Sequence, residues 1–199
     1  MSYQYKKNYY PTFILEDFLE NPDDVVEYSK SLKFFKPEKD ENWPGLRTKS
    51  LHLFNEKLFN YIVLKILSVY YDFSFHKVKY FDTNVMFHKI YLKDYLNFNK
   101  KHTNIHRDND FELAGVLYLN KKFSEKTGTT IFDDSENEII KISNNYNTLV
   151  CYDAKKIHGV NNILDEERLS IVIFIGKIEI EKNINERLND LGKSYTVQE

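Results

Sequence analysis

The sequence of 199 residues holds one cysteine, Cys151, and six glycines. A single cysteine excludes an intrachain disulfide and favours a reducing compartment. The N-terminal residues lack the continuous apolar core of a secretory signal, and the longest apolar runs, such as 171–175, are far too short to cross a bilayer. We therefore expect a cytoplasmic protein without a membrane partner.

An excess of one charge is also missing, since the formal net charge is −2. No global basic field attracts nucleic acid, so a nucleic-acid partner is not expected. Hydrophobic residues make up 42% of the chain and charged residues 29%, an ordinary globular balance. The length fits one domain with a single core.

Aromatic residues are abundant, with 15 Tyr and 15 Phe. Aromatic side chains pack well on pleated surfaces, which favours a strand-rich fold. Within a single domain over 1–199, the patterns predict a mixed helix and strand support over 1–83 and a β core over 84–176. A helix and tail are predicted over 177–199.

Two helices are predicted in the first region, after a strand over 12–19. Asn21 can cap a helix that begins with Pro22 and runs to about Phe34. A second helix, over 55–71, is indicated by apolar residues at three- and four-residue intervals. This stripe consists of Leu58, Phe59, Ile62, Val63, Ile66, Leu67 and Tyr70. A short closing helix is predicted over 184–191.

From Val85 onward, short β-type runs alternate with polar turns. Their spacing favours a mostly-β fold with flanking helices, namely a double-stranded β-helix (a cupin-like jelly roll), over βαβ units. The predicted strands are 85–92, 103–108, 111–119, 129–132, 138–142, 148–152 and 168–175.

The first candidate for chemistry is the pair His106 and Asp108. Residues two apart in a strand point to the same face, so an imidazole and a carboxylate can reach one metal ion. His158, directly after a predicted strand, is the best third ligand. Two histidines and one carboxylate form the facial triad of non-haem Fe(II) oxygenases. The tripeptide alone is a weak signal, and a surface histidine at a strand end is its structural alternative.

The second candidate is Arg168 with Ser170, at the start of an apolar strand. Both side chains share a face, and a guanidinium that points into a barrel is costly unless an anion meets it. A planar fork suits a carboxylate, to which the hydroxyl can add a hydrogen bond. The alternative is an arginine at a strand edge that pairs with Glu166 or Glu167.

Together these motifs resemble the 2-oxoglutarate-dependent oxygenases. An HxD motif, a distal histidine and an RxS motif follow one another in the family's order. The likeness covers about residues 84–176 and is nearest to prolyl-hydroxylase-like members, including uncharacterised phage and bacterial chains. The segments GVLYLNKKFSEKTGTTIF and NTLVCYDAKKIHGV carry it, as the strand-loop-strand unit and the strand before the distal histidine.

The resemblance implies an enzyme, a dioxygenase that uses Fe(II), 2-oxoglutarate and O2 and releases succinate and CO2. The catalytic metal ligands would be His106, Asp108 and His158. Arg168 and Ser170 would bind the distal carboxylate of 2-oxoglutarate, and Tyr118 would donate its hydroxyl to it, unless it is a plain core tyrosine. The hydroxylated substrate, a protein or peptide side chain such as proline or a small molecule, is not specified.

Several positions depart from the family pattern or stay open. The usual double glycine is replaced by Thr127-Gly128-Thr129, and we expect Thr129 near the site. Asn104 shares a face with His106, where a structural hydrogen bond is favoured over contact with a ligand. Either Tyr91 or Tyr95 is expected to line the cosubstrate pocket. For His88, a surface or core position is favoured over the pocket.

Trp43-Pro44-Gly45 predicts a turn before Arg47. An exposed loop arginine is favoured here over one that faces the pocket and binds a substrate anion. Two other functions compete with the oxygenase. A cupin-like enzyme can hold Zn or Mn with the same triad, and a non-catalytic jelly-roll module can bind a carboxylate or glycan.

Overall fold

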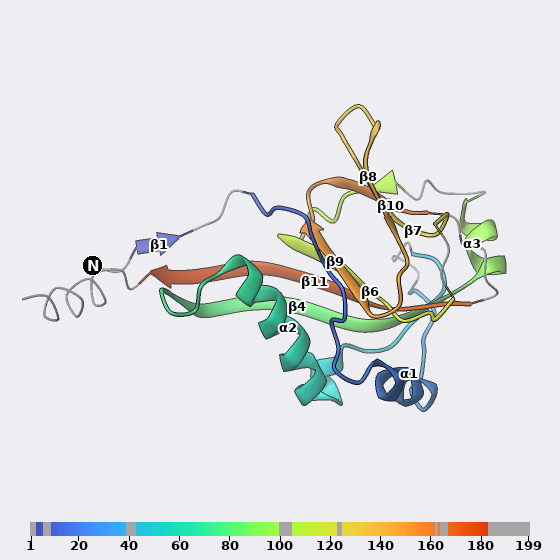
Figure 1. Cartoon of the computed structure of the whole chain (residues 1–199), viewed down its shortest axis with the longest axis horizontal. Helices are drawn as coiled ribbons and strands as arrows, with labels where there is room; N and C mark the ends of the chain where they lie inside the picture. The colour runs from blue at the N-terminus through green and yellow to red at the C-terminus, as the bar shows by residue number, and fades with distance from the viewer. Residues whose placement is uncertain are drawn as a thin grey trace, which may run out of the picture.

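Antiparallel strands are the main secondary structure of the chain in a computed structural model (Figure 1). The structure describes residues 3–5, 9–38, 43–99, 105–122, 125–161, 163 and 167–182. The helices are α1 (Pro22–Lys30), η1 (Leu51–Leu53, a 3-10 turn), α2 (Glu56–Tyr70) and α3 (Leu92–Asn99). The strands are β1 (Tyr3–Tyr5), β2 (Phe13–Leu15), β3 (Leu46–Arg47), β4 (His76–Tyr91), β5 (Ile105–His106), β6 (Leu113–Tyr118), β7 (Gly128–Phe132), β8 (Glu138–Ser143), β9 (Thr148–Asp153), β10 (Ile157–Val160) and β11 (Glu167–Lys182).

The strands form two sheets. The larger sheet has the order β2-β9-β6-β11-β4-β3, with β1 added to β11, and the smaller sheet has the order β5-β10-β7-β8. The strands from β4 to β11 divide between the sheets in an interleaved order, which is the arrangement of a jelly roll. The predicted double-stranded β-helix with flanking helices is therefore confirmed.

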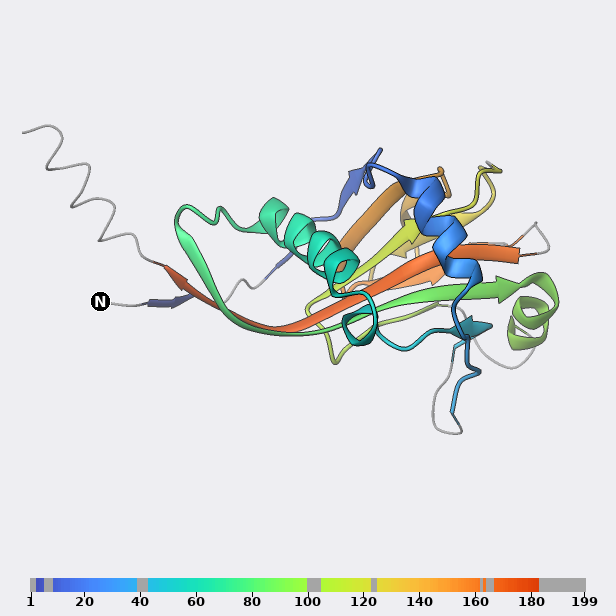
Figure 2. The same cartoon turned by 90° about the horizontal axis from the view of Figure 1, so that it is seen from below.

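The two faces of the larger sheet differ because side chains alternate along each strand. In β11, Leu169, Ile171 and Ile173 are buried in the main core, which includes α2. Arg168 and Ser170 point to the opposite side, toward the smaller sheet. Helices α1 and α2 lie across the outer face (Figure 2). The sheet thus has one apolar outer face and one inner face that carries polar groups.

Helix α2 confirms the predicted apolar stripe. The side chain of Asn55 caps its start by accepting a hydrogen bond from the backbone of Leu58, at 3.1 Å. The buried residues of the helix are Phe59, Ile62, Val63, Ile66, Leu67 and Tyr70. The helix therefore covers the apolar outer face of the larger sheet and shields it from solvent.

Other elements differ from the predictions. The strand expected over 12–19 is only β2, because Asp17 adopts a left-handed conformation with φ 48° that ends it. Helix α1 ends at Lys30, before the predicted Phe34, and α3 and β10 lie in segments whose patterns predicted neither. The helix expected over 184–191 lies outside the described residues.

Strands β4 and β11 are 16 residues long each, twice the length of their predicted runs. Beyond the sandwich they continue as a two-stranded arm that meets β1 (Figure 1). In the arm, β11 alternates charged and apolar residues from Lys177 to Lys182, with Ile178 and Ile180 buried, so the predicted run ended too early. Strand β11 ends at Lys182, past the expected boundary at residue 176, and the division of the chain into domains stays a prediction.

No helix in the described part of the chain is both long enough and apolar enough to cross a membrane.

Candidate metal centre and buried arginine

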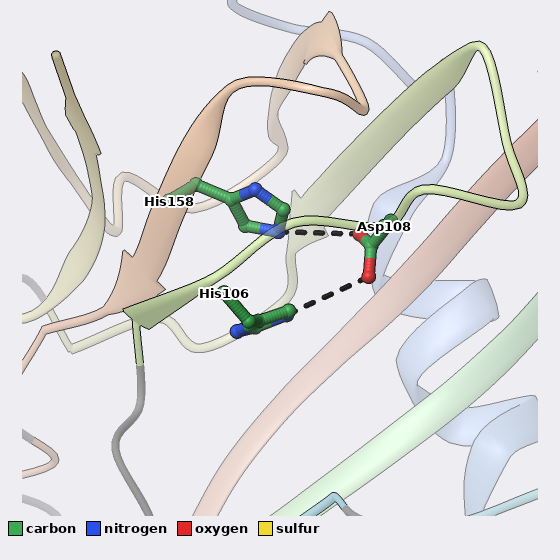
Figure 3. A group of neighbouring side chains, drawn as sticks. All are labelled: His106, Asp108 and His158. Carbon is green, nitrogen blue, oxygen red and sulfur yellow. Dashed lines mark ion pairs between the residues drawn. The ribbon is translucent and has the colours of Figure 1, made fainter. Parts of the chain in front are cut away.

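Three metal-binding side chains come from two neighbouring strands of the smaller sheet. His106 in β5 lies directly opposite His158 in β10 in the antiparallel register. Asp108 follows β5, and its backbone N–H donates to the carbonyl of Ala154 at 2.9 Å. This bond holds the turn so that all three side chains point to one place (Figure 3).

The distances fit one metal ion. Nε2 of His158 lies 3.2 Å from Oδ2 of Asp108, and Nε2 of His106 lies 3.6 Å from Oδ1 (Figure 3). Each residue offers a ligand atom within 4.8 Å of the others. Two ligand atoms about 2.1 Å from one ion, at right angles, lie about 3 Å apart. Small side-chain shifts therefore complete a three-ligand site.

A hydrogen bond to His158 determines which of its ring nitrogens can bind a metal. Its Nδ1 lies 2.9 Å from the carbonyl oxygen of Lys156. Because a carbonyl can only accept, Nδ1 carries the proton, and Nε2 keeps its lone pair for the ion. The ring of Tyr152 packs against the imidazole with centroids 4.7 Å apart.

The three ligands differ in their exposure to solvent. The side chain of His158 is 5% exposed, that of Asp108 17% and that of His106 51%. A cavity of about 920 Å³ extends from the triad into the space between the sheets. It leaves room beside the ion for other ligands.

Arg168 lines this cavity as a buried cation, 5% exposed. Within the described part of the chain, its Nε and Nη1 and the Oγ of Ser170 have no hydrogen-bond partner. Burial lowers the pKa of the guanidinium, and the nearby tyrosines oppose this effect by raising the pKa. The alternative, an arginine that pairs with a neighbouring glutamate at the strand edge, fails for Glu167, whose carboxylate lies 3.9 Å from Nζ of Lys89 instead. Glu166 lies outside the described residues. Buried polar groups without partners are rare, so this pair is suited to an anion.

Tyr118 lies beneath Arg168, whose Cζ is 5.4 Å from the ring centroid. Its buried hydroxyl donates to Oγ1 of Thr129 at 2.7 Å, and burial raises its pKa. Thr129 lines the cavity as expected, whereas Tyr118 is not part of the described lining. Tyr118 is opposite Ser170 in the sheet, so the three predicted anion-binding residues are neighbours.

Two cavity residues were misjudged from the sequence. Arg47 in β3 is half-buried and lines the cavity, so the expectation of an exposed loop arginine is wrong. His88, its partner in β4, is buried and also lines the cavity. Burial lowers the pKa of His88 well below its usual value, as does the nearby Arg47 guanidinium. No local sequence signal reveals either residue, because the pairing of β3 with β4 is non-local.

The remaining open residues fall elsewhere. Tyr95 is buried, and its hydroxyl donates to the carbonyl of Val160 at 3.4 Å. Among the described residues, neither Tyr91 nor Tyr95 belongs to the cavity lining. Asn104 lies outside the described residues.

Solved structures share this fold. A 2OG-Fe(II) oxygenase family protein from Burkholderia pseudomallei aligns with a TM-score of 0.54 at 12% identity, over 83% of this chain and 84% of that one. The non-heme alpha ketoglutarate dependent epimerase SnoN from nogalamycin biosynthesis gives 0.56 at 11% identity, over 82% and 76%. A Pseudomonas putida prolyl-4-hydroxylase gives 0.47 at 14% identity, over 83% and 91%, too weak a similarity to argue from.

These neighbours and the three-ligand cluster define the class: a double-stranded β-helix protein with the architecture of 2OG-Fe(II) oxygenases and a possible His-Asp-His metal site. Residues 2–148 match a family of unknown function, DUF6445, and the chain belongs to that family. No curated protein matches the sequence.

Proposed function

We propose that this chain is an Fe(II)- and 2-oxoglutarate-dependent dioxygenase, related to the prolyl-hydroxylase-like members, that hydroxylates an organic substrate and releases succinate and CO2. One observation supports it above all: a three-ligand cluster and a buried arginine, whose Nε and Nη1 have no hydrogen-bond partner among the described residues, open into the same cavity. The cytoplasmic location stays a prediction.

The ligand set suits Fe(II). His106, Asp108 and His158 would hold one face of a six-coordinate ion and leave three positions for cosubstrate and O2. When bound, iron and 2-oxoglutarate together supply the oxidising chemistry that attacks a C–H bond. The Lys156 carbonyl fixes the imidazole of His158, and Asp108 supplies one negative charge.

The anion pocket suits the cosubstrate. Arg168 and Ser170 would receive the distal carboxylate, since their polar atoms are buried and unsatisfied within the described residues. The charges also balance: the divalent ion and one guanidinium offset the Asp108 carboxylate and a dicarboxylate. A zinc or manganese hydrolase does not require such a buried cation, so the oxygenase is the better account.

The experiment is a succinate assay. We expect metal-depleted protein, reconstituted with Fe(II), to convert 2-oxoglutarate to succinate in air, slowly alone and faster with a true substrate. Zn(II) or Mn(II) in place of iron is expected to give none. Absence of succinate with iron, across a panel of candidate substrates, would overturn the proposal and leave the metalloenzyme or the binding module.

A further inference from the structure

The turn that joins β9 to β10, residues 154–156, supports both strands of the candidate metal centre. The carbonyl of Ala154 accepts a hydrogen bond from the backbone N–H of Asp108 at 2.9 Å. The carbonyl oxygen of Lys156 lies 2.9 Å from Nδ1 of His158. The turn therefore holds one ligand from each strand, and its position determines how the two ligands face one another.

The shape of this turn is fixed by Asp153, whose side chain is buried at its start. One carboxylate oxygen, Oδ1, accepts a hydrogen bond from the backbone N–H of Lys155 at 2.9 Å, and Oδ2 accepts one from the N–H of Tyr10 at 3.3 Å. The backbone carbonyl of Asp153 accepts a third, from the N–H of Lys156 at 3.0 Å. The turn is thus a firm support that needs no metal ion to form.

Strand β5 is held less firmly than the turn. It lies at the edge of the smaller sheet and pairs with β10 at two positions only, where Ile105 is opposite Gly159 and His106 is opposite His158. A segment with few backbone hydrogen bonds opens locally at little cost in free energy. Contacts made by side chains of this segment therefore matter for the position of His106 and Asp108.

Arg107, between these two ligands, makes such a contact. Its Nη1 donates to the carbonyl of Lys155, and its Nη2 donates to Oδ1 of Asp134 at 2.8 Å. The Asp134 side chain is 93% exposed, and an ion pair so close to water contributes little. The bond to the carbonyl is the one that joins β5 to the turn. The three successive carbonyls of the turn, 154–156, thus each accept a hydrogen bond from the segment or the histidine that forms the metal centre.

We propose that Arg107 is a positioning residue for the metal ion: it holds β5 against the β9–β10 turn, so that His106 and Asp108 face His158. Arg107 is not part of the described cavity lining and acts through these ligands. Charge alone would have the opposite effect, because removal of a nearby positive charge strengthens the binding of a cation. The role rests on the metal site of the proposed function.

Metal affinity gives a readout that does not depend on turnover. We would titrate metal-depleted protein with Co(II) and follow the visible absorption of the bound ion. Arg107→Met keeps the apolar stem but removes both donors, and it should raise the dissociation constant about tenfold or more, as loss of an outer-shell partner does. Arg107→Lys retains a donor and should recover part of the affinity.

Two matched variants separate the carbonyl bond from the charges around it. Asp134→Ala removes only the exposed ion pair. Lys155→Ala removes one positive charge from the turn, as Arg107→Met does, but keeps the backbone carbonyl. Both variants should bind Co(II) as the wild type does.

Three results would overturn the inference. The first is Co(II) binding in Arg107→Met that equals or exceeds that of the wild type. The second is a loss in Asp134→Ala or Lys155→Ala as large as that in Arg107→Met. The third is a loss in Arg107→Met that is explained by unfolding, which a lower urea midpoint of the metal-free variant would report.

Failure of the inference can be told from failure of the proposed function. Wild-type protein that binds Co(II) no more tightly than Arg107→Met refutes only the role of Arg107, provided that the iron-loaded protein makes succinate. Wild-type protein that binds Co(II) more tightly than Arg107→Met but makes no succinate with iron keeps the positioning role and loses the oxygenase. Wild-type protein that binds neither ion loses both.

Discussion

The two faces of the larger sheet are made by the same strands and yet differ in kind. On the outer face of β11, Ile171 and Ile173 are buried among the apolar residues of the main core. On the inner face, Arg168 and Ser170 keep buried polar atoms without partners among the described residues. The outer face is packed against other apolar side chains, whereas the inner face carries polar atoms that a ligand can bind. Substitutions on the outer face should therefore act on stability, and those on the inner face on ligand binding.

The largest expected effect is that of Asp108→Ala. With only two imidazoles left, iron should bind poorly, and succinate formation should fall about a thousandfold or more. Stability should change little, because the substitution removes one partly exposed carboxylate. Asp110→Ala, two residues further on and exposed, is the control and should keep its iron. Full activity in Asp108→Ala would show that the triad is not the metal site.

Ile171→Ala tests the outer face. Truncation of this fully buried side chain should lower the free energy of unfolding by about 2–5 kcal/mol in urea titrations. Activity per folded molecule should stay unchanged, because the side chain points away from the cavity. A stable variant with impaired 2-oxoglutarate binding would mean that the two faces are not independent.

Arg168→Ala tests the inner face. The cosubstrate KM should rise about 10- to 100-fold, since a charge-assisted pair is lost, while kcat changes less. The free energy of unfolding should stay the same or increase, because the substitution removes a buried charge whose Nε and Nη1 have no hydrogen-bond partner among the described residues. Arg168→Lys should lie between the two, and a wild-type KM in the alanine variant would refute the carboxylate clamp.

The smallest effect concerns His88, whose pKa is lowered by burial and by Arg47. Below about pH 6.5 His88 is protonated in the unfolded chain but stays neutral in the folded chain. The free energy of unfolding should thus fall as pH drops, by at most about 1.4 kcal/mol per unit. His88→Gln should flatten this dependence between pH 7 and 5.5 in urea titrations. Equal slopes in both proteins would show that His88 accepts a proton in the folded state.

Local spacing explains how much of the site could be predicted. His106 and Asp108 share a strand face, and so do Arg168 and Ser170, so that each pair is visible in the sequence. His158 was recognisable because it follows a strand in a familiar order. The sheet order brings these pieces together, and it agrees with the predicted fold.

Arg47 and His88 could not be placed in the same way. Their position depends on the pairing of a two-residue strand with β4 and on a glycine turn pressed against it. Neither feature leaves a periodic hydropathy signal. The outer arm was missed for a different reason: the prediction followed the continuous apolar run of β11 and did not use the alternation of Ile178 and Ile180 with charged residues beyond it.

The most direct test of the metal and cosubstrate site is the visible spectrum of the oxygen-free protein with Fe(II) and 2-oxoglutarate. We predict a charge-transfer band that requires both additions, is absent in Asp108→Ala, and needs more 2-oxoglutarate in Arg168→Ala. A wild-type protein that gives no such band with saturating iron and cosubstrate would contradict the account.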